Sequence, residues 1–428
     1  MPLELKLSDF SHRINNFIEV LVSIIIMKIK MIRFFLVAFA ILTMGITNAC
    51  VAHNKGAFIW TNGSRHTNLI DSAGLLVKVK NTLSTKRTAQ TIALDWKRLC
   101  KKVKNATVNN IVVYDAITNK QIPSQVLYKG KKSPQDLIFQ TDISAETTLN
   151  FIIRTGTRDD YKRKTFGRQV PERFDDFAWE NDVVAFRMYG AALETQPDNA
   201  KGLDVWSKNT PELVLNKWYK EGDYHTNHGL GMDGYKVGFS LGAGDSAPLI
   251  GDKFIFPKNY DSYKIIDEGP IRLTFELNFS AWNVNGQQVT ETKRITLDAG
   301  SSINKIENFY HFKVGVLPIA VGVTKHSGDG SIKLDNINNY VSYWDKTDGK
   351  IDNGMIGVGV IFPAAEGFKL ADQANHLLGL KTLRKNQQFV YYQGATWNRG
   401  GHFTNEDEWL KYLENYSKNL QQPLIVAF

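Results

Sequence analysis

The sequence predicts an all-β protein. We expect a small immunoglobulin-like β-sandwich, then a large antiparallel body of two sheets, and one short helix near the C-terminus. Short segments rich in Val, Ile, Leu and aromatic residues recur between turn-forming residues, and no helical spacer separates them. The composition agrees, because 43% hydrophobic and 11% aromatic residues are typical of a soluble, strand-rich protein.

The first 50 residues have the pattern of a secretory signal peptide. Lys28, Lys30 and Arg33 precede a continuous apolar run at 34–46, which closes with small residues before Cys50. The run is short for a stable membrane span, so no transmembrane span is expected in the mature protein. We therefore expect export across the inner membrane, to the periplasm or to a membrane anchor.

The sequence leaves two features of this leader undecided, its start and its processing near Cys50. Met27 and Met31 are alternative starts to the first methionine. Ile46–Cys50 resembles a bacterial lipoprotein box, although its Thr and Asn are off-pattern, so a lipid anchor on Cys50 and simple cleavage near Ala49 are both open. In either case Cys100 is a lone thiol, so we expect the hydrophobic core to stabilise the fold without a disulfide.

The small β-sandwich domain is expected at residues 55–156, because β signals recur there at a spacing of roughly 12–15 residues, in the manner of immunoglobulin-like domains. The expected strands are Leu75–Lys80, Thr91–Trp96, Asn110–Asp115, Gln125–Tyr128, Leu137–Gln140 and Leu149–Arg154. Residues 157–170 contain the charge-dense run Arg158–Arg168 and are predicted to be a basic linker.

A charged stretch at Pro171–Gly190 is the first candidate for function. Its second half alternates with the period of a strand, so Arg187 and Tyr189 share one face and apolar side chains occupy the other. Asp176 and Glu180 add carboxylates on the approach to this strand. The alternative is an edge strand with solvated ion pairs.

A second candidate is the glycine-punctuated segment Glu221–Gly234, which contains Tyr224, His225 and His228. Its glycines make a helix unfavourable. Histidines and a tyrosine in such a loop favour acid/base chemistry or contact with a sugar. A divalent cation held by both histidines and a neighbouring aspartate is a weaker alternative, since the spacing matches no specific zinc motif, and structural histidines are another.

The large domain is expected at residues 171–428. Ile271–Trp282 alternates cleanly, Asn285-Gly286 is typical of a type I′ hairpin turn, and Val289–Leu297 returns. His326 follows a predicted strand at its exit into a loop, where a structural histidine is the alternative. Further strands are expected at Ile303–His311, Ile319–Lys325, Ile356–Phe362 and Phe389–Tyr392.

Near the C-terminus, Trp397 and Arg399 lie in a second glycine-rich loop. A tryptophan platform beside an arginine suits a sugar ring that carries a carboxylate, although an ordinary turn with an exposed tryptophan has the same sequence features. The one legible helix follows, with Thr404 and Asp407 as its capping signature. Its apolar stripe is expected at Trp409, Tyr412, Leu413 and Tyr416.

The formal charge of the chain is +9, of which the leader contributes +2, so the remainder carries 9 − 2 = +7. This mild excess favours anionic partners. No basic run with interleaved aromatic residues other than Arg158–Arg168 stands out, so nucleic acid is not expected as a partner. The sequence also contains no phosphate loop, dinucleotide fingerprint or serine-nucleophile elbow.

Four motifs carry a resemblance to a known family: ERFDDFAWENDVVAFRMYG, LDVW, YHTNHGLGMDGYKVG and GATWNRGG. With them, essentially the whole mature chain resembles bacterial secreted proteins of the family called domain of unknown function 4861. The resemblance implies a role in the breakdown of polysaccharides that contain uronic acids. It also implies that the large domain is similar to the β-supersandwich of galactose mutarotases and several polysaccharide lyases. It implies no particular catalytic residue.

The leading hypothesis is a carbohydrate-active enzyme that acts on anionic oligosaccharides or polysaccharides by β-elimination. Such chemistry needs a cation for the uronate carboxylate, a base for the C5 proton and an acid for the leaving O4. Arg187 or Arg399 is expected to bind the carboxylate, His228 to be the base, and Tyr189 or Tyr224 to be the acid.

Three alternatives stay open: hydrolysis by two carboxylates, including hydrolysis of unsaturated uronate oligosaccharides, a mutarotase-like or epimerase-like reaction, and glycan binding without catalysis. Non-catalytic binding predicts aromatic platforms such as Trp206 and Trp397 on an open surface. No cofactor is expected. The candidate catalytic residues are His228, Tyr189, Tyr224, His225 and His326, and the candidate substrate-binding residues are Arg187, Glu180, Asp176, Trp206, Trp397 and Arg399.

Overall fold

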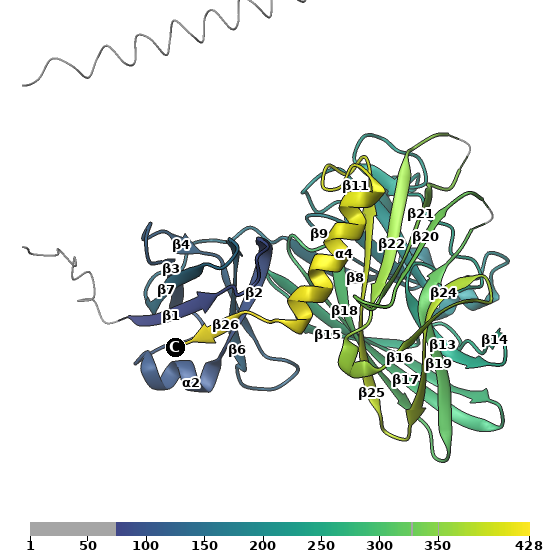
Figure 1. Cartoon of the computed structure of the whole chain (residues 1–428), viewed down its shortest axis with the longest axis horizontal. Helices are drawn as coiled ribbons and strands as arrows, with labels where there is room; N and C mark the ends of the chain where they lie inside the picture. Colours follow the sequence, from purple (N-terminus) through teal and green to yellow (C-terminus); the bar gives the residue numbers. More distant parts are fainter. Residues whose placement is uncertain (1–73, 327, 350) are drawn as a thin grey trace, which may run out of the picture. The chain divides into compact units, whose positions relative to one another are not determined.

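A computed structural model describes residues 74–326, 328–349 and 351–428 (Figure 1). The expected signal peptide and the lipidation site at Cys50 lie outside the described residues. Among the residues described, no helix is both long enough and apolar enough to cross a membrane. The fold is all-β with antiparallel sheets, which confirms the predicted class.

A small sandwich of two sheets comes first in the described chain. One sheet has the strand order β26-β1-β7-β3-β4 and the other the order β2-β6-β5. Their apolar faces enclose a core that includes Val77, Leu94, Phe139 and Phe151. The strands are β1 (Leu75–Lys80), β2 (Arg87–Asp95), β3 (Ile111–Asp115), β4 (Gln121–Ile122), β5 (Ser124–Leu127), β6 (Asp136–Ile143), β7 (Thr148–Thr155) and β26 (Ile425–Ala427).

This sandwich also contains a helix that periodicity did not predict, α2 (Trp96–Lys102). At seven residues the helix is too short to show a 3.6-residue repeat. Asp95 caps it, because its carboxylate accepts a hydrogen bond from the main-chain N–H of Arg98 at 2.7 Å. Within the described chain, Cys100 is the one cysteine and its thiol is free; burial raises its pKa.

Two predicted domain bounds differ from the structure. The C-terminal strand β26 pairs with β1 of the small sandwich, so the last residues complete that sandwich rather than the large domain. The second half of the predicted linker forms strand β8 (Thr165–Val170), which pairs with β9 (Asp176–Asn181). Local sequence cannot show either fact, because both depend on pairing with distant strands.

The large body has an eight-stranded sheet as one layer, in the order β15-β16-β17-β18-β25-β22-β21-β20. The predicted hairpin is confirmed: β16 and β17 pair along their length, and Asn285 and Gly286 have φ values of 48° and 86°, as a type I′ turn requires. The strands are β15 (Ser262–Asp267), β16 (Arg272–Val284), β17 (Gln287–Asp298), β18 (Ile303–His311), β20 (Ser331–Asp335), β21 (Tyr340–Lys346), β22 (Met355–Ile361) and β25 (Gln388–Trp397).

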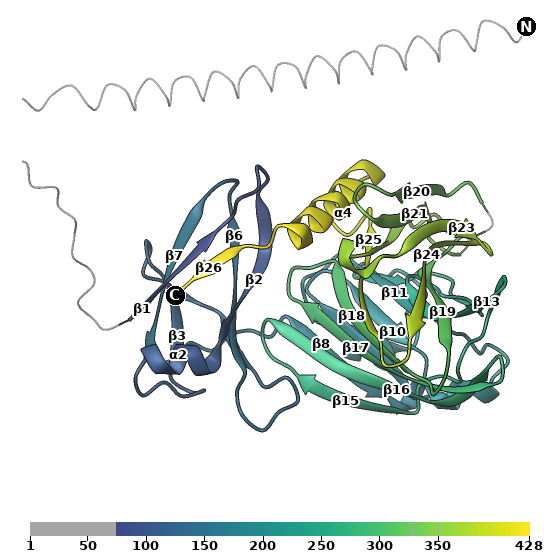
Figure 2. The ribbon, with the colours of Figure 1, turned by 60° about the horizontal axis from the view of Figure 1, so that its bottom comes forward.

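Two five-stranded sheets form the opposite layer, in the orders β12-β11-β10-β9-β8 and β14-β13-β19-β24-β23 (Figure 2). A continuous apolar core, which includes Phe177, Phe186, Phe275 and Val358, lies between the layers. The remaining strands are β10 (Ala185–Met188), β11 (Leu203–Lys208), β12 (Gly231–Asp233), β13 (Asp245–Ile250), β14 (Lys253–Phe254), β19 (Val316–Thr324), β23 (Lys369–Gln373) and β24 (His376–Arg384).

Helix α4 (Glu406–Gln421) is the predicted C-terminal helix, and its stripe packs on the outer face of the eight-stranded sheet. The predicted cap is off by one residue. Asn405 accepts from the N–H of Glu408 at 3.0 Å, while Thr404 donates to the Glu408 carboxylate. The other helices within the described residues are α3 (Leu215–Glu221) and three 3-10 turns, η1 (Pro171–Arg173), η2 (Ala191–Thr195) and η3 (Ala364–Glu366).

Candidate functional site

The sheet β12-β11-β10-β9-β8 has two different faces. Phe186 and Met188 of β10 point into the main core, while Arg187 points to the opposite face, as the alternation predicted. Helix α3 covers that second face with Leu215 and Trp218. β10 lies in the middle of this sheet, so the alternative of a solvated edge strand is wrong.

Four adjacent strands each contribute one residue to a cluster of charges on the face below α3. Arg187 on β10 lies directly opposite Asp204 on β11, and its Nη2 is 2.5 Å from the Asp204 carboxylate. The same Nη2 lies 2.9 Å from Asp233 of β12, and Nη1 lies 3.7 Å from Asp176 of β9. All four side chains are buried. We call Arg187, Asp176, Asp204 and Asp233 the Arg187 cluster.

Aromatic rings enclose the guanidinium of Arg187. Its central carbon lies 5.1 Å from the ring centre of Tyr189, 5.0 Å from Trp206 and 5.7 Å from Tyr224. Burial by itself lowers the pKa of Arg187, but the charges of Asp204 and Asp233 outweigh it and hold that pKa above its ordinary value. Arg187 is therefore a permanent buried cation.

Three carboxylates share this one cation, and two of them, Asp176 and Asp233, have raised pKa values. Burial raises the pKa of Asp176 to about 6, against the opposing charge of Arg187. Burial and the nearby charge of Asp204 raise the pKa of Asp233 well above its usual range. Both carboxylate oxygens of Asp176, and Nε and Nη1 of Arg187, are buried without a hydrogen-bond partner. Such unsatisfied groups are rare in purely structural charge networks.

His225 connects the Arg187 cluster to solvent. Its Nδ1 lies 3.4 Å from the Asp233 carboxylate, while 66% of its side chain is exposed. Loss of water on the side that faces the cluster lowers the pKa of His225, and the charges of Arg187 and Arg173 lower it further. A main-chain hydrogen bond at Asp233 and the charge of Asp204 act in the opposite direction. His225 is therefore an accessible imidazole that is neutral at pH 7 and oriented by a buried carboxylate.

Arg173 is a functional candidate that the sequence hypothesis did not include. Its Nε donates to the hydroxyl of Tyr224 at 3.0 Å, Nη2 lies 3.4 Å from the exposed Asp198, and Nη1 is buried with no partner. The next two residues, Phe174 and Asp175, have left-handed φ values of 50° and 62°. A bulky aromatic residue such as Phe174 rarely adopts this conformation, and such strain is concentrated at functional sites.

His228, which the sequence predicted as the base, lies away from the Arg187 cluster. Its Nε2 is 3.0 Å from the Asp223 carboxylate, and both side chains are more than half exposed. Of the two histidines in the glycine-punctuated loop, the structure brings His225 and not His228 to the Arg187 cluster.

Glu180 does not face a substrate. It is fully buried, its carboxylate lies 2.6 Å from Nζ of Lys208, and it accepts the main-chain N–H groups of Val214 and Leu215 at the start of α3. Glu180 thus neutralises a buried lysine and caps a helix. The sequence placed it on the approach to the alternating strand, but could not show that α3 covers it.

The two tryptophans expected as sugar platforms are also buried. Trp206 lies below α3, in ring contact with Trp218, and its Nε1 donates to Asp204 at 3.1 Å. Trp397 on β25 is 3% exposed, and its Nε1 donates to the carbonyl of Asn353 at 2.7 Å. Neither ring is free to stack on a sugar in this structure.

Arg399 and His326 lie apart from the Arg187 cluster and bind other groups. Arg399 is exposed and pairs with Asp352 at 3.3 Å. The Nε2 of His326 lies 2.8 Å from the carbonyl oxygen of Lys236, and its ring packs against Tyr235 at 4.9 Å. The structure therefore brings together Asp176, Arg187, Tyr189, Tyr224 and His225, with Trp206 as a buried wall.

No group of three or more His, Cys, Asp or Glu residues in the described part of the chain is arranged to hold a metal ion. The Arg187 cluster has an arginine at its centre, where a metal site would have a cation. The donor set therefore fits charge relay and proton transfer better than coordination.

The fold and the site define an all-β protein with a buried arginine–carboxylate cluster next to an exposed histidine. The chain belongs to the family described as domain of unknown function (DUF4861), which matches residues 79–426. It is similar to uncharacterized protein P7 of Formosa agariphila, with 29% identity over 377 residues that cover 83% of this chain and 94% of that protein.

Two solved structures from Enterococcus faecalis also match. A protein in the glycosyl hydrolase family 38 has 12% identity and a TM-score of 0.48, over 84% of this chain and 48% of that one. An alpha-mannosidase has 11% identity and a TM-score of 0.48, over 83% of this chain and 46% of that one. The chain spans about half the length of these two structures.

Proposed function

We propose that this protein is a carbohydrate-active enzyme that cleaves uronic-acid-containing glycans by β-elimination at the surface beside the Arg187 cluster. One observation carries the proposal. An accessible imidazole, His225, is held by the buried carboxylate of Asp233 next to Arg173, whose Nη1 has no partner. A neutral base beside a guanidinium that has one nitrogen without a partner is the pair that removal of a proton next to a carboxylate requires.

His225 is the proposed base. With Nδ1–H facing the carboxylate of Asp233, the lone pair lies on Nε2, which is the ring nitrogen directed away from the cluster. The lowered pKa keeps the imidazole neutral at pH 7 and ready to accept a proton. Arg187 has an indirect role: it fixes Asp233, which in turn fixes the ring.

Arg173 is the proposed partner of the substrate carboxylate, in place of Arg187. Arg187 is committed to three carboxylates and lies below the surface, whereas the Nη1 of Arg173 has no partner. A guanidinium bound to the uronate carboxylate stabilises the negative charge that develops when the C5 proton leaves.

Tyr224 is the proposed acid. Its hydroxyl oxygen accepts from Arg173 Nε, which leaves its own proton free to be donated, and its ring lies 4.8 Å from that of His225. The C5–H bond breaks with its proton on His225 Nε2, the double bond forms between C4 and C5, and the C4–O4 bond breaks as O4 takes the proton of Tyr224.

The alternatives have weaker support. Asp204 and Asp233 are close together, since both contact the same nitrogen of Arg187, but both are buried, whereas hydrolysis needs two carboxyl groups that flank the scissile bond. Simple binding lacks the open aromatic platforms expected of Trp206 and Trp397. An epimerase would use the same His225 as base, so analysis of the reaction products distinguishes epimerisation from β-elimination.

The test is absorbance near 235 nm while the mature protein is incubated with saturated and 4,5-unsaturated uronate oligosaccharides. A rise on saturated substrates that is lost in His225→Gln and retained in His228→Gln is expected. A fall on the unsaturated set means that the double bond is consumed, and overturns elimination in favour of hydrolysis. A flat trace with every substrate overturns elimination of those glycans.

A further inference from the structure

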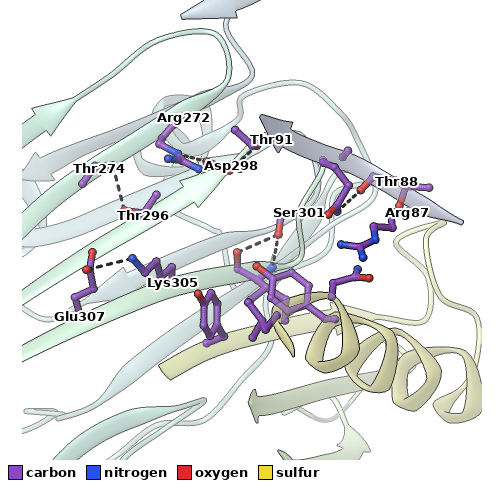
Figure 3. Close-up of a pocket in the computed structure, with 18 of the residues that line it drawn as sticks. Arg87, Thr88, Thr91, Arg272, Thr274, Thr296, Asp298, Ser301, Lys305 and Glu307 are labelled. Atoms are coloured by element: carbon purple, nitrogen blue, oxygen red, sulfur yellow. Dashed lines mark hydrogen bonds and ion pairs between the residues drawn. The ribbon is translucent and has the colours of Figure 1, made fainter. Parts of the chain in front are cut away.

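A cleft of about 550 Å³ lies on the opposite layer of the large body from the Arg187 cluster. Its walls are β2 of the small sandwich, the outer face of strands β15 to β18, and helix α4 (Figure 3). Direct hydrogen bonds fix the two sides: Thr91 donates to Asp298 at 2.7 Å, and Gln140 donates to the carbonyl of Ala299 at 2.9 Å. The cleft is therefore built into the fold.

The lining of this cleft is basic. Six lysines and arginines face three aspartates and glutamates, which leaves 6 − 3 = +3. Most of the basic residues have an acidic partner; Arg272 pairs with Asp298 at 2.6 Å and Lys305 with Glu307 at 3.1 Å (Figure 3). Among the described residues that line the cleft, Arg87 is the basic residue without an acidic partner.

Arg87 is a buried cation without a counter-ion. Only 2% of it is exposed, Nε donates to the amide oxygen of Asn81 at 2.8 Å, and Nη2 donates to the carbonyl of Gln422 at 2.5 Å. Both acceptors are neutral, and within the described chain Arg87 makes no ion pair. A buried charge in this situation is costly, and an anion that enters the cleft removes most of the cost.

Helix α4 contributes unsatisfied acceptors to the same cleft. Asn415 and Asn419 are one helical turn apart and line it, and the amide oxygen of each is buried with no partner. Gln422, which accepts from Arg87, follows directly after the helix. Amide oxygens need donors, whereas Arg87 needs an anion, so one ligand that serves both must combine hydroxyl groups with a negative charge.

Sugar-type contacts complete the lining. Tyr392 and Tyr416 form a ring pair at 5.6 Å, and Thr274 and Thr296 share a hydrogen bond at 3.1 Å on the sheet surface (Figure 3). Aromatic rings pack against the apolar face of a sugar ring, and hydroxyls exchange hydrogen bonds with its edge.

We propose that this cleft is a second saccharide site, which binds an acidic sugar with its carboxylate or sulfate on Arg87 and its hydroxyls on the amide oxygens of Asn415 and Asn419. The site is separate from His225 and does not depend on the reaction proposed above. It would hold a part of an anionic glycan that is not being cleaved, and so increase the time that the enzyme spends on the polymer.

The experiment is isothermal titration of the mature protein in the His225→Gln background, which prevents turnover. The probes are a tetragalacturonate, its carboxyl-reduced neutral counterpart and a sulfated galactan tetrasaccharide. If both proposals hold, two tetragalacturonates bind; Arg87→Gln removes one site and Arg173→Gln the other. Loss of the charge-assisted contact should weaken the cleft site by about tenfold to a hundredfold. The sulfated probe shows whether sulfate replaces carboxylate.

Arg158→Gln is the matched control. Arg158 also donates only to carbonyl oxygens of the small sandwich, those of Val108 and Ser124, but does not line the cleft. If Arg87→Gln unfolds the protein, Asn419→Asp replaces it, because a carboxylate of the same shape repels an anionic ligand. Unchanged binding in both Arg87→Gln and Asn419→Asp, or equal binding of the neutral probe, overturns the proposal. A single site that is lost in Arg87→Gln and kept in Arg173→Gln upholds the cleft and overturns the substrate role of Arg173.

Discussion

Two groups of buried charges lie on the same face of the same sheet, below helix α3, and they differ in how well they are satisfied. In the first, Glu180 pairs with Lys208 at 2.6 Å and caps the helix, and Lys208 also donates to the carbonyls of Asn181 and Glu212. Neither charged side chain has a buried atom without a partner.

The Arg187 cluster differs in each of these respects. Three carboxylates share one guanidinium, four of the polar atoms have no hydrogen-bond partner, and the pKa of Asp176 is raised by burial to about 6. An exposed histidine touches the cluster, whereas none touches Glu180. The comparison teaches that a buried pair with all its hydrogen bonds made belongs to the fold, while buried charges that lack partners beside solvent are the better candidate for a functional site.

The largest expected effect is a loss of catalytic activity, which separates the Arg187 cluster from the Glu180–Lys208 pair. His225→Gln should lower kcat/KM by about 10²-fold to 10⁴-fold, because it removes the base, and should leave the melting temperature nearly unchanged, because most of the side chain is exposed. Initial rates at 235 nm and a thermal melt measure both. His228→Gln is the control and should keep its activity. An equal loss of activity in the two variants contradicts the assignment.

Lys208→Met should show the opposite behaviour. It leaves the buried carboxylate of Glu180 without its cation, so the free energy of unfolding should fall by about 3–5 kcal/mol. Urea unfolding measures this change, and activity per folded molecule should be retained. The matched control is Lys162→Met, which breaks an exposed pair with Glu212 and should cost less than about 1 kcal/mol. Similar losses in the two variants would remove the distinction between buried and exposed pairs.

Asp176→Asn tests whether the Arg187 cluster weakens the fold. The folded-state pKa of Asp176, about 6, lies above its unfolded value of about 3.9, so the folded protein binds more protons between these pH values. The stability of the natural protein therefore falls as pH rises through this window, by up to about 3 kcal/mol, and this contribution is constant above it.

The asparagine variant lacks that titration. Relative to the natural protein it should be more stable at pH 7 and should lose this advantage at pH 3.5, in urea unfolding at the two pH values. Asp175→Asn is the neighbouring control, since Asp175 is more exposed than the fully buried Asp176. A constant difference at both pH values contradicts the raised pKa.

The smallest effect is a shift in pH dependence. The positive charge of Arg173 helps to lower the pKa of His225, so Arg173→Gln should move the acid limb of the pH–rate profile to higher pH, together with a rise in KM. If Arg173 had only a structural role, its replacement would change the rate and leave the pH of the acid limb unchanged. Arg168→Gln, which breaks a surface pair with Glu172, is the control.

Much of the fold could be predicted, because strand periodicity is local. The range Ile303–His311 agrees with β18 at both ends, and the hairpin at Asn285-Gly286 has the expected turn. Helix α3 escaped prediction because it has only seven residues: Leu215, Trp218 and Tyr219 fall at i, i+3 and i+4, but one such repeat is too short to identify a helix. That single omission made Glu180 and Trp206 seem accessible, since nothing in the sequence showed what covered them.

The site was only partly predictable for a related reason. Asp204 lies in the LDVW motif, and Arg173 lies at the start of the charged stretch, yet neither was a candidate. The left-handed conformations of Phe174 and Asp175, which follow Arg173, carry no residue-type signal. His225 was a candidate, but the spacing within its loop gave no reason to prefer it to His228.

The sequence by itself determined that Arg187 and Tyr189 share one face of a strand whose other face is apolar, because successive side chains alternate by covalent geometry. Only the tertiary structure decided that Asp176, Asp204 and Asp233 meet that arginine and that His225 closes the group. Those contacts depend on the register of four strands and on a helix that excludes water, which are set by packing across the whole domain rather than by neighbours along the chain.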